Sequence, residues 1–422
     1  MKNSKLNWYQ KYSKRFLFQE EQLQSKPVNK KTELIVVIPC YNEESLISTF
    51  KSLVKSIVPE GIVVEIITVI NHGENEIIEV KNKNKETYLQ AEDFAENVKV
   101  RGLNFLNLRA FDLPKKHAGV GLARKIGMDE ALHRFHSIGK DGIIVCFDAD
   151  SICEENYFET IFDHFNANEK INGASIHFEH PIFGKDYSNS IYDAIIDYEL
   201  HLRYYKNAIK FLDVPYAFHT IGSSMAVKSS AYAKQGGMNK RKAGEDFYFL
   251  SKIIQLGNFS EITNTKVIPS PRISDRVPFG TGRAVGDIIN SEIKEYKTYS
   301  FNAFLDLKIF FSQIDEARID TNYEELPASL KLFFNVENYE MKLSEIKANT
   351  KTLESYKQRF YFVFDAFFIL KFVHFYRDNF IKNSNLNIEA KKVLKTFGIF
   401  DVEACNNKEL LAVYRKLDLG NI

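Results

Sequence analysis

Two aspartates separated by one small residue form the feature of this sequence best suited to do chemistry. Asp148 and Asp150 follow the apolar run at residues 143–147, which is typical of a buried strand. Ligands of open α/β sheets bind beyond the carboxyl ends of the strands. Mg²⁺ binds through one or two protein carboxylates, and phosphate oxygens complete its shell. The pair therefore predicts a site for a metal-bound diphosphate; for an isolated pair, a solvated turn is the alternative.

A second acidic pair, Glu245 and Asp246, opens the apolar run at residues 247–250. A carboxylate near a reacting centre can take the proton of an attacking hydroxyl, while its neighbour holds the acceptor. Acidic residues also favour the first turn of a helix. The spacing alone leaves both interpretations open.

The sequence contains no G-x-x-x-x-G-K-[ST], H-E-x-x-H or G-x-S-x-G motif. At residues 119–124, Arg124 stands where a dinucleotide fingerprint needs its third glycine, which argues against a Rossmann dehydrogenase. Lys115, Lys116 and His117 precede this glycine-containing helix start. Such a helix start is a suitable place for an anion.

Alternating strands and helices are expected to position these groups. The apolar runs expected to form the first buried strands lie at residues 34–38, 62–70, 103–108 and 143–147. Helices are expected at 43–57 and 119–132, and further strands at 174–178 and 222–228. Strand and helix in alternation predict a mostly parallel sheet with flanking helices.

The last third of the chain has a different pattern. Beyond residue 285 glycine becomes rare, Pro327 is the only proline, and apolar residues recur at helical spacing. Residues 360–380 contain ten Phe or Tyr, which predicts an aromatic helix in a core. We therefore expect a basic lead-in at 1–31, an α/β domain at 32–285 and an all-helical domain at 286–422.

Composition excludes several classes of protein. The 422 residues are 45% hydrophobic, and 56 Lys and Arg against 55 Asp and Glu give a net charge of +1. That balance cannot supply the broad basic field of a non-specific nucleic-acid-binding protein. The best candidate for a transmembrane segment, residues 360–376, is interrupted by Asp365, Lys371 and His374.

Cysteine usage and the lead-in bear on location. The four cysteines form no C-x-x-C pair, and residues 1–31 lack the apolar core of a signal peptide. We therefore expect a cytoplasmic protein. The lead-in carries six net positive charges, which would attract an anionic leaflet and favour a peripheral place at the inner membrane surface.

Four ordered motifs resemble those of the family-2 glycosyltransferases of GT-A fold over residues 33–285. The matching segments are Pro39-Cys40-Tyr41-Asn42-Glu43, Ala123-Arg124-Lys125-Ile126-Gly127, Asp148-Ala149-Asp150, and the block from Gly222 to Glu245-Asp246. Lys125 replaces the asparagine usual in the second motif.

The resemblance implies a sugar transferred from a UDP- or GDP-linked donor to a hydroxyl of a glycan, lipid-linked or small acceptor, with inversion. It implies Mg²⁺ or Mn²⁺ on Asp148 and Asp150, and Asp246 as the base beside Glu245. The residues expected to bind the nucleotide sugar are Pro39, Tyr41, Glu43, Asn71, Arg124, Asp148 and Arg276.

The sequence departs from the family pattern in two places. Its second strand ends in Asn71-His72-Gly73 instead of paired acids, which leaves the base contact open. Arginines 272, 276 and 283 around Gly280 replace the Q-x-x-R-W of processive synthases, so we expect a non-processive enzyme. We expect this loop to move and an arginine to reach the diphosphate; pairing with acids of the helical domain is the alternative.

Two other functions are compatible with such a sheet. A nucleotidyltransferase also uses paired acids and a metal, but it would need a glycine-rich basic loop directly after the first strand, where Pro39 to Glu43 stand. A sugar-nucleotide-binding protein without turnover would keep the fold. The intact Asp148, Asp150 and Asp246 argue against that reading.

Overall fold

The computed structural model describes residues 7–19, 22–277, 280–291, 295–314 and 323–422. The chain forms two compact units: an α/β unit of residues 1–186 and 220–284, and a helical unit of residues 187–219 and 285–422. This division differs from the expected boundaries because residues 187–219 join the helical unit. The basic lead-in also belongs to the α/β unit and is no separate segment.

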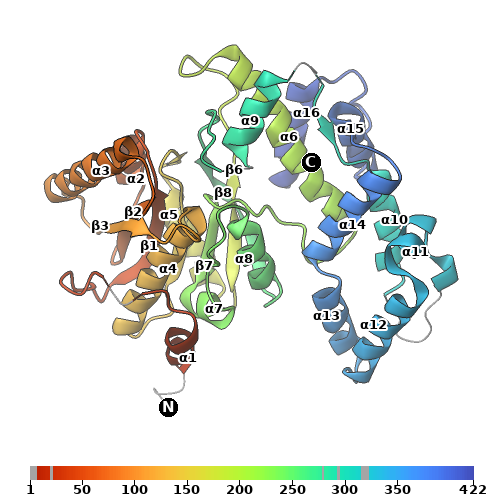
Figure 1. The fold of residues 1–422 in the computed structure, drawn as a ribbon, viewed down its shortest axis with the longest axis horizontal. Helices are drawn as coiled ribbons and strands as arrows, with labels where there is room; N and C mark the ends of the chain where they lie inside the picture. The colour runs from red at the N-terminus through yellow and green to blue at the C-terminus, as the bar shows by residue number, and fades with distance from the viewer. Residues whose placement is uncertain (1–6, 20–21, 278–279, 292–294, 315–322) are drawn as a thin grey trace. The chain divides into compact units, whose positions relative to one another are not determined.

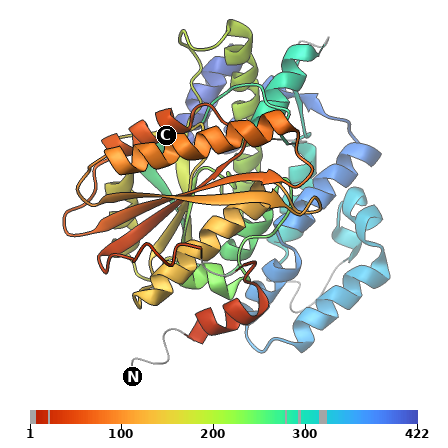
Figure 2. The ribbon, with the colours of Figure 1, turned by 60° about the vertical axis from the view of Figure 1, so that its left-hand side comes forward.

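A mixed sheet forms the centre of the α/β unit (Figure 2). Its strands are β1 Thr32–Cys40, β2 Val63–Gly73, β3 Leu103–Leu113, β4 Ile143–Cys146, β5 Ile152–Cys153, β6 Gly173–Phe178, β7 Met225–Lys228 and β8 Phe259–Ile268. Among the described residues their order is β3-β2-β1-β4-β7-β6-β8-β5. Strands β1 to β4 are mutually parallel, as the sequence predicts, and β7 is antiparallel to β4 and β6. The carboxyl ends of β1, β2 and β4 therefore meet at one edge.

Helices cover both faces of this sheet. They are α1 Asn7–Arg15, α2 Leu46–Lys55, α3 Ile78–Asn97, α4 Val120–Ser137, α5 Tyr157–Ala167, α7 Ser229–Lys234 and α8 Glu245–Ile254. In Figure 2, α3 lies over one face and α4 over the other. Residues 74–97, which are poor in apolar periodicity, form α3 because Val80, Asn84, Thr87 and Ala91 share a buried stripe.

Helix α4 is buried along most of its length, because the sheet lies on one side of it and the lead-in on the other. Tyr12 of α1 is 1% exposed, and its hydroxyl donates to Asp129 of α4 at 2.5 Å. Lys125 donates to the Tyr12 hydroxyl at 2.7 Å. Lys125, where the family has asparagine, therefore anchors the lead-in.

Gly127 lets α4 lie close to the sheet. A Cβ atom at this position would meet Val37 and Val69 side chains of β1 and β2, the latter at 2.9 Å. Both valines are buried and β-branched, so they have little freedom to turn away.

We expect Gly127→Ala to lower the free energy of unfolding by about 1 to 3 kcal/mol through overpacking, although alanine is the better helix former. Urea denaturation followed by circular dichroism measures this. The control is Ser48→Ala on the exposed side of α2, which should change stability by less than about 0.5 kcal/mol. Equal stability of the two variants would contradict this account of Gly127.

The helical unit is built on an aromatic core. Its helices are α6 Asn189–Phe211, α10 Asn302–Ser312, α11 Ala328–Phe334, α12 Val336–Ala348, α13 Leu353–Val363, α14 Ala366–Asn379, α15 Leu386–Thr396 and α16 Asn407–Asp418, and α9 Thr281–Asn290 lies at the boundary (Figure 1). Phe310 contacts the rings of Phe334, Phe360, Phe364 and Phe368. None of the helices in the described ranges is both long and apolar enough to cross a bilayer.

The single aromatic helix expected at 360–380 is wrong. The helix is interrupted between α13 and α14, where the Asp365 carboxylate accepts the backbone N–H groups of Phe367 and Phe368 at 3.0 Å. An aspartate that caps a helix in this way starts a new helix.

Buried ion pairs explain why α6 belongs to the helical unit. Arg203 of α6 donates to Asp418 of α16 at 2.5 Å, and Lys206 donates to the same carboxylate at 3.0 Å. Glu199 pairs with Arg203 and Arg415. A buried charge without its partner is costly, so these contacts hold α6 and α16 together.

Candidate active site

Strand β1 brings the first motif to the carboxyl edge. It runs through Pro39 to Cys40, beyond the expected end at residue 38. Proline has no N–H to donate, and at Pro39 that side of the backbone faces β4. The hydrogen bonds between β1 and β4 have already ended there, the last being from the Phe147 N–H to the Val37 carbonyl. Asn42 then adopts a positive φ of 48°, which asparagine tolerates, and its N–H donates to the Asn84 side chain at 2.8 Å.

Strand β4 delivers the two aspartates to the same edge. The side chains of Asp148 and Asp150 are 37% and 20% exposed. Burial raises the pKa of Asp150 to about 6; the charges of Asp148 and Glu43 add to the rise, and Arg272 opposes it. The two aspartate side chains are thus partly exposed and lie among other charged groups, which differs from a fully solvated turn.

Arg124 joins the two acidic motifs of the sequence. It lies in the first turns of α4 and donates to Asp148 Oδ1 at 2.5 Å and to Glu245 Oε1. Gly222 makes room for it, because a Cβ atom there would come within 2.5 Å of the guanidinium carbon. Gly222, which opens the fourth motif, is therefore needed for the position of the arginine.

Helix α8 presents the second acidic pair. Gly244 precedes it with a φ of 68°, a left-handed conformation that glycine adopts without strain. Glu245 is 2% exposed and paired with Arg124, whereas Asp246 is only partly buried. Burial raises the pKa of Asp246, and Arg124 opposes the rise. Asp246 is thus the member of the pair that remains accessible.

Two arginines of the segment after β8 pair with acids of this edge. Arg272 donates to Glu43 at 2.9 Å and contacts Asp150 at 2.8 Å, and Arg276 donates to Glu43 at 3.0 Å. Burial opposes the ionisation of Glu43, but the hydrogen bonds from Arg272 and the Ser45 backbone lower its pKa. Arg283 instead pairs with exposed Asp275 of the same unit.

The acids that Arg272 and Arg276 contact belong to the α/β unit, and the alternative pairing with acids of the helical domain stays a prediction. The expected movement of their loop stays a prediction, and Pro278 and Phe279 within it lie outside the described residues.

The charges of the site suit a divalent cation. Arg124, Arg272 and Arg276 stand against five carboxylates, those of Glu43, Asp148, Asp150, Glu245 and Asp246. With all groups ionised the formal charge is −2, which one divalent cation balances. No cluster of three or more potential ligands occurs within the described part of the chain. Two hard oxygen donors nevertheless fit Mg²⁺ or Mn²⁺, because phosphate and water complete such shells.

The remaining candidate residues have different environments. Asn71 is buried, and its side-chain amide donates to the Cys40 carbonyl at 3.0 Å, which ties β1 to β2. Tyr41 is half-buried, and its hydroxyl donates to Glu76 at 2.7 Å. Asn71 therefore holds the end of β1 against β2, and Tyr41 is the more exposed of the two residues.

Sequence reasoning missed Asn84, which lies in α3 and connects two motif segments. Its side chain accepts from Asn42 and donates to the Asn71 carbonyl at 3.0 Å. The available signal was the helical spacing of Asn84 and Thr87 with Val80 and Ala91 in a segment rich in charged residues.

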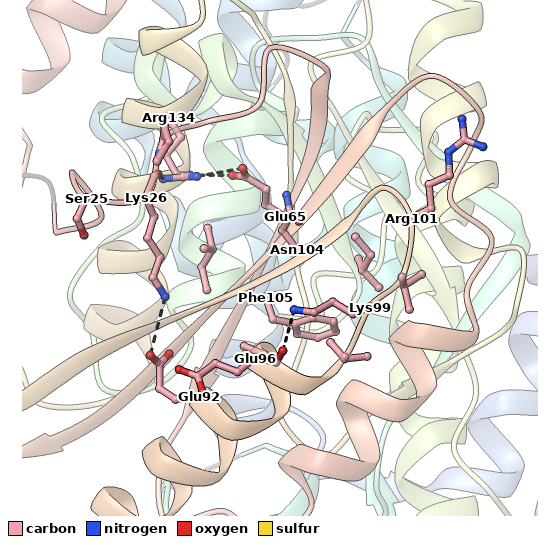
Figure 3. A pocket seen from close by; sticks show the side chains of 16 residues that line it. Ser25, Lys26, Glu65, Glu92, Glu96, Lys99, Arg101, Asn104, Phe105 and Arg134 are labelled. Atoms are coloured by element: carbon pink, nitrogen blue, oxygen red, sulfur yellow. Dashed lines mark hydrogen bonds and ion pairs between the residues drawn. The ribbon is translucent and has the colours of Figure 1, made fainter.

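A separate cavity of about 660 Å³ lies at the other end of the strands (Figure 3). The first residues of β3, the end of α3 and the buried pair Glu65 and Arg134 line it. Lys26 and Glu92 form an ion pair at its edge. None of the acids and arginines of the candidate active site lines this cavity.

The fold and the site together define an α/β enzyme of the GT-A type, with paired carboxylates at the carboxyl edge of its sheet. Residues 35–234 match the family model described as glycosyl transferase family 2. The match covers a little under half of the chain, and it supports a glycosyltransferase. Glu245 and Asp246 lie beyond the matched range, so their assignment depends on the geometry given above.

Solved structures of glycosyltransferases resemble the chain at low identity. S. aureus TarS 1–349 in complex with UDP-GlcNAc is 12% identical, with 78% of this chain and 91% of that chain covered and a TM-score of 0.40. The mannosyltransferase PcManGT from Pyrobaculum calidifontis is 14% identical, with 98% and 94% covered and a TM-score of 0.32. A search of the curated proteins returned no match.

Proposed function

We propose that the enzyme transfers a sugar from a nucleotide-diphosphate donor to a hydroxyl of an acceptor in a metal-dependent, inverting and non-processive reaction. The observation that carries this proposal is Arg124, which binds Asp148 and Glu245 at once. It places a carboxylate pair suited to a metal diphosphate beside a carboxylate pair suited to acid–base work. The two alternatives, a nucleotidyltransferase and an inactive binding protein, give no role to Asp246.

Asp246 is the proposed base. Glu245 is buried and neutralised by Arg124, so its carboxylate has no free path to an acceptor hydroxyl. Asp246 accepts the Phe247 N–H at 2.8 Å, which fixes its orientation at the helix start. A base held in place beside the leaving group can take the hydroxyl proton as the new bond forms.

Asp150 and Asp148 would hold Mg²⁺ or Mn²⁺. When bound, such an ion neutralises the diphosphate leaving group. The chain's own contribution is to keep both aspartates at the end of β4 and to hold Asp148 through Arg124. The proposed donor is UDP- or GDP-linked, with Tyr41 and Pro39 lining its pocket.

Arg272 and Arg276 are proposed to bind the diphosphate of the sugar donor. Before the donor binds, they pair with Glu43 and Asp150. Guanidinium groups bind phosphate through paired N–H donors, and a metal on Asp150 would compete for that carboxylate. Loss of a charge-assisted hydrogen bond costs about 1.5 to 3 kcal/mol. We therefore expect Arg272→Met to weaken nucleotide-diphosphate binding by about 10-fold or more, as measured by calorimetry with Mn²⁺.

Arg283→Met is the matched control for this variant. It removes an arginine of the same segment that pairs with Asp275, whose side chain is 80% exposed. Binding should change by less than about 2-fold, because surface ion pairs contribute little. Equal losses in the two variants would mean that Arg272 only maintains the shape of the segment.

A donor panel tests the proposed function itself. UDP- and GDP-sugars are incubated with the enzyme and Mn²⁺, and free nucleotide diphosphate is measured with and without EDTA. Release of nucleotide diphosphate supports a glycosyltransferase of the proposed mechanism, and release of pyrophosphate from a nucleoside triphosphate would support the nucleotidyltransferase. Donor binding without release under all conditions would support the inactive protein.

We further infer a cytoplasmic location, which the four free thiols suit. The acceptor is proposed to be a glycan, free or lipid-linked. Contact with an anionic leaflet is tested together with the acceptor below.

A further inference from the structure

Two exposed loops of the α/β unit bring positive charges together next to the acidic pair. Lys115 and Lys116 precede α4, and Lys240, Arg241 and Lys242 precede α8. We call these five residues the basic face. The loops touch, because a Cβ atom on Gly119 would meet the Lys242 backbone at 3.2 Å and one on Gly121 would meet the Arg241 carbonyl.

The charges of the basic face are not balanced by neighbours. Within the described ranges none of the five side chains forms an ion pair with an acid, and Arg241 lies 3.7 Å above the ring of Tyr248. Glu74 accepts the backbone N–H of Lys115, and not its ammonium group, at 3.0 Å. In a chain with a net charge of +1, such a concentration of like charge has an electrostatic cost and suits an anionic ligand.

The basic face leads directly to the proposed base. Asn239, at the start of the loop, donates to the backbone carbonyl of Glu245 at 2.9 Å. A Cβ atom on Gly121 would also lie 3.0 Å from the Glu245 Cβ atom. A molecule bound along this loop therefore lies next to the first turn of α8, which carries Asp246.

Helix α1 extends the positive surface. Lys11, Lys14 and Arg15 are exposed on it, and the helix packs beside α7 (Figure 1). Phe16 lies against Gly236, and Lys240 lies 5.3 Å from the ring of Phe18. The lead-in and the loop thus form one continuous side of the α/β unit.

We propose that the acceptor is an anionic glycan, carrying phosphate or carboxylate groups, and that the basic face binds it. This inference rests on the proposed function, because it assigns the acceptor side of the same site. Neither loop carries an exposed large apolar residue, and Phe16, directly after α1, is the one such residue at the described positions 7–19. A surface that inserts into a leaflet pairs its charges with several apolar side chains, so the observations favour a soluble polyanion over a membrane.

The test uses long-chain inorganic polyphosphate, labelled with fluorescein, as the probe on the full chain. Anisotropy is measured at low and high salt, with neutral dextran for comparison. Lys240→Gln/Lys242→Gln should weaken polyphosphate binding by about 10-fold, since exposed charge interactions contribute up to about 1 kcal/mol each. The control is Lys51→Gln/Lys55→Gln on exposed positions of α2, which should change binding by less than about 2-fold.

Three results would overturn the proposal. Polyphosphate binding that is absent, or equal in the two double variants, would show that the basic face is not an anion site. Displacement of a nucleotide diphosphate by polyphosphate would place the probe in the donor pocket. Tighter binding to vesicles of phosphatidylglycerol and phosphatidylcholine in equal parts, lost in Lys240→Gln/Lys242→Gln, would assign the face to a membrane.

Donor binding with Mn²⁺ is measured on the same variants to separate the two proposals. It should be unchanged in Lys240→Gln/Lys242→Gln. Failure of donor binding in every form, with polyphosphate binding intact, would reject the proposed function and leave the anion site in place.

Discussion

Replacing Asp246 with asparagine should lower the rate of sugar transfer by at least about 100-fold while donor binding persists. Asparagine keeps the size of the side chain and can still accept the Phe247 N–H, but it cannot take a proton. General-base catalysis by a positioned side chain contributes about 10²- to 10⁴-fold, so the loss should fall in kcat. Steady-state transfer with a Mn²⁺-loaded donor, together with calorimetry of donor binding, measures both quantities.

The control for this prediction is Glu159→Gln. Glu159 lies in the first turn of α5, is exposed and, like Asp246, favours the start of its helix. If Asp246 only stabilises α8, both variants should lose a few tenths of a kcal/mol of stability and keep their activity. Transfer by Asp246→Asn at close to the wild-type rate would remove Asp246 from the base assignment.

Replacing Asp150 with asparagine should abolish the metal dependence of donor binding. The carboxylate lies 20% exposed at the end of β4, between Asp148 and the two arginines, and an amide is a much weaker ligand for a hard cation. Residues that only support a metal ligand already cost about 10- to 100-fold in affinity when mutated, so loss of a ligand should cost at least about 100-fold. Nucleotide-diphosphate binding titrated with and without Mn²⁺ measures this.

Asp275→Asn serves as the control for Asp150→Asn. Asp275 is 80% exposed, belongs to the same arginine-containing segment and pairs with Arg283, so its loss should leave the effect of Mn²⁺ intact. Equal affinity of the wild-type enzyme for nucleotide diphosphate in Mn²⁺ and in EDTA would reject Asp150 as a metal ligand.

The parallel half of the sheet could be predicted from the sequence because its strands are short apolar runs that alternate with helices. Those runs predicted that β1 and β4 exist, and with them that Glu43, Asp148 and Asp150 follow strands, but they did not predict the exact residues at which the strands end. The boundaries were less certain. Pro39 suggested the end of a strand, but the strand continues because the neighbouring ladder stops two residues earlier.

Two expectations about the rest of the chain differ from the structure, one because of a local helix cap and the other because of a distant contact. Periodicity at 360–380 predicts one helix, whereas Asp365 starts a second one by capping it. Helix α6 precedes β7 in the chain, yet Arg203 and Lys206 tie it to Asp418, about 210 residues away. A pattern of local spacing has no means to show such a partner.

The residue types of this protein by themselves determined the chemistry that the site can do: carboxylates for a cation and a proton, arginines for phosphates, and glycines where no side chain fits. Tertiary structure alone decided which of these groups act together. Arg124 meets both Asp148 and Glu245, 24 and 121 residues away, because α4 crosses the sheet with Gly127 against β1 and β2 and because Gly222 leaves space for the guanidinium. The same packing buries Glu245 and leaves Asp246 accessible, since burial of a charge depends on the groups around it and not on its place in the sequence.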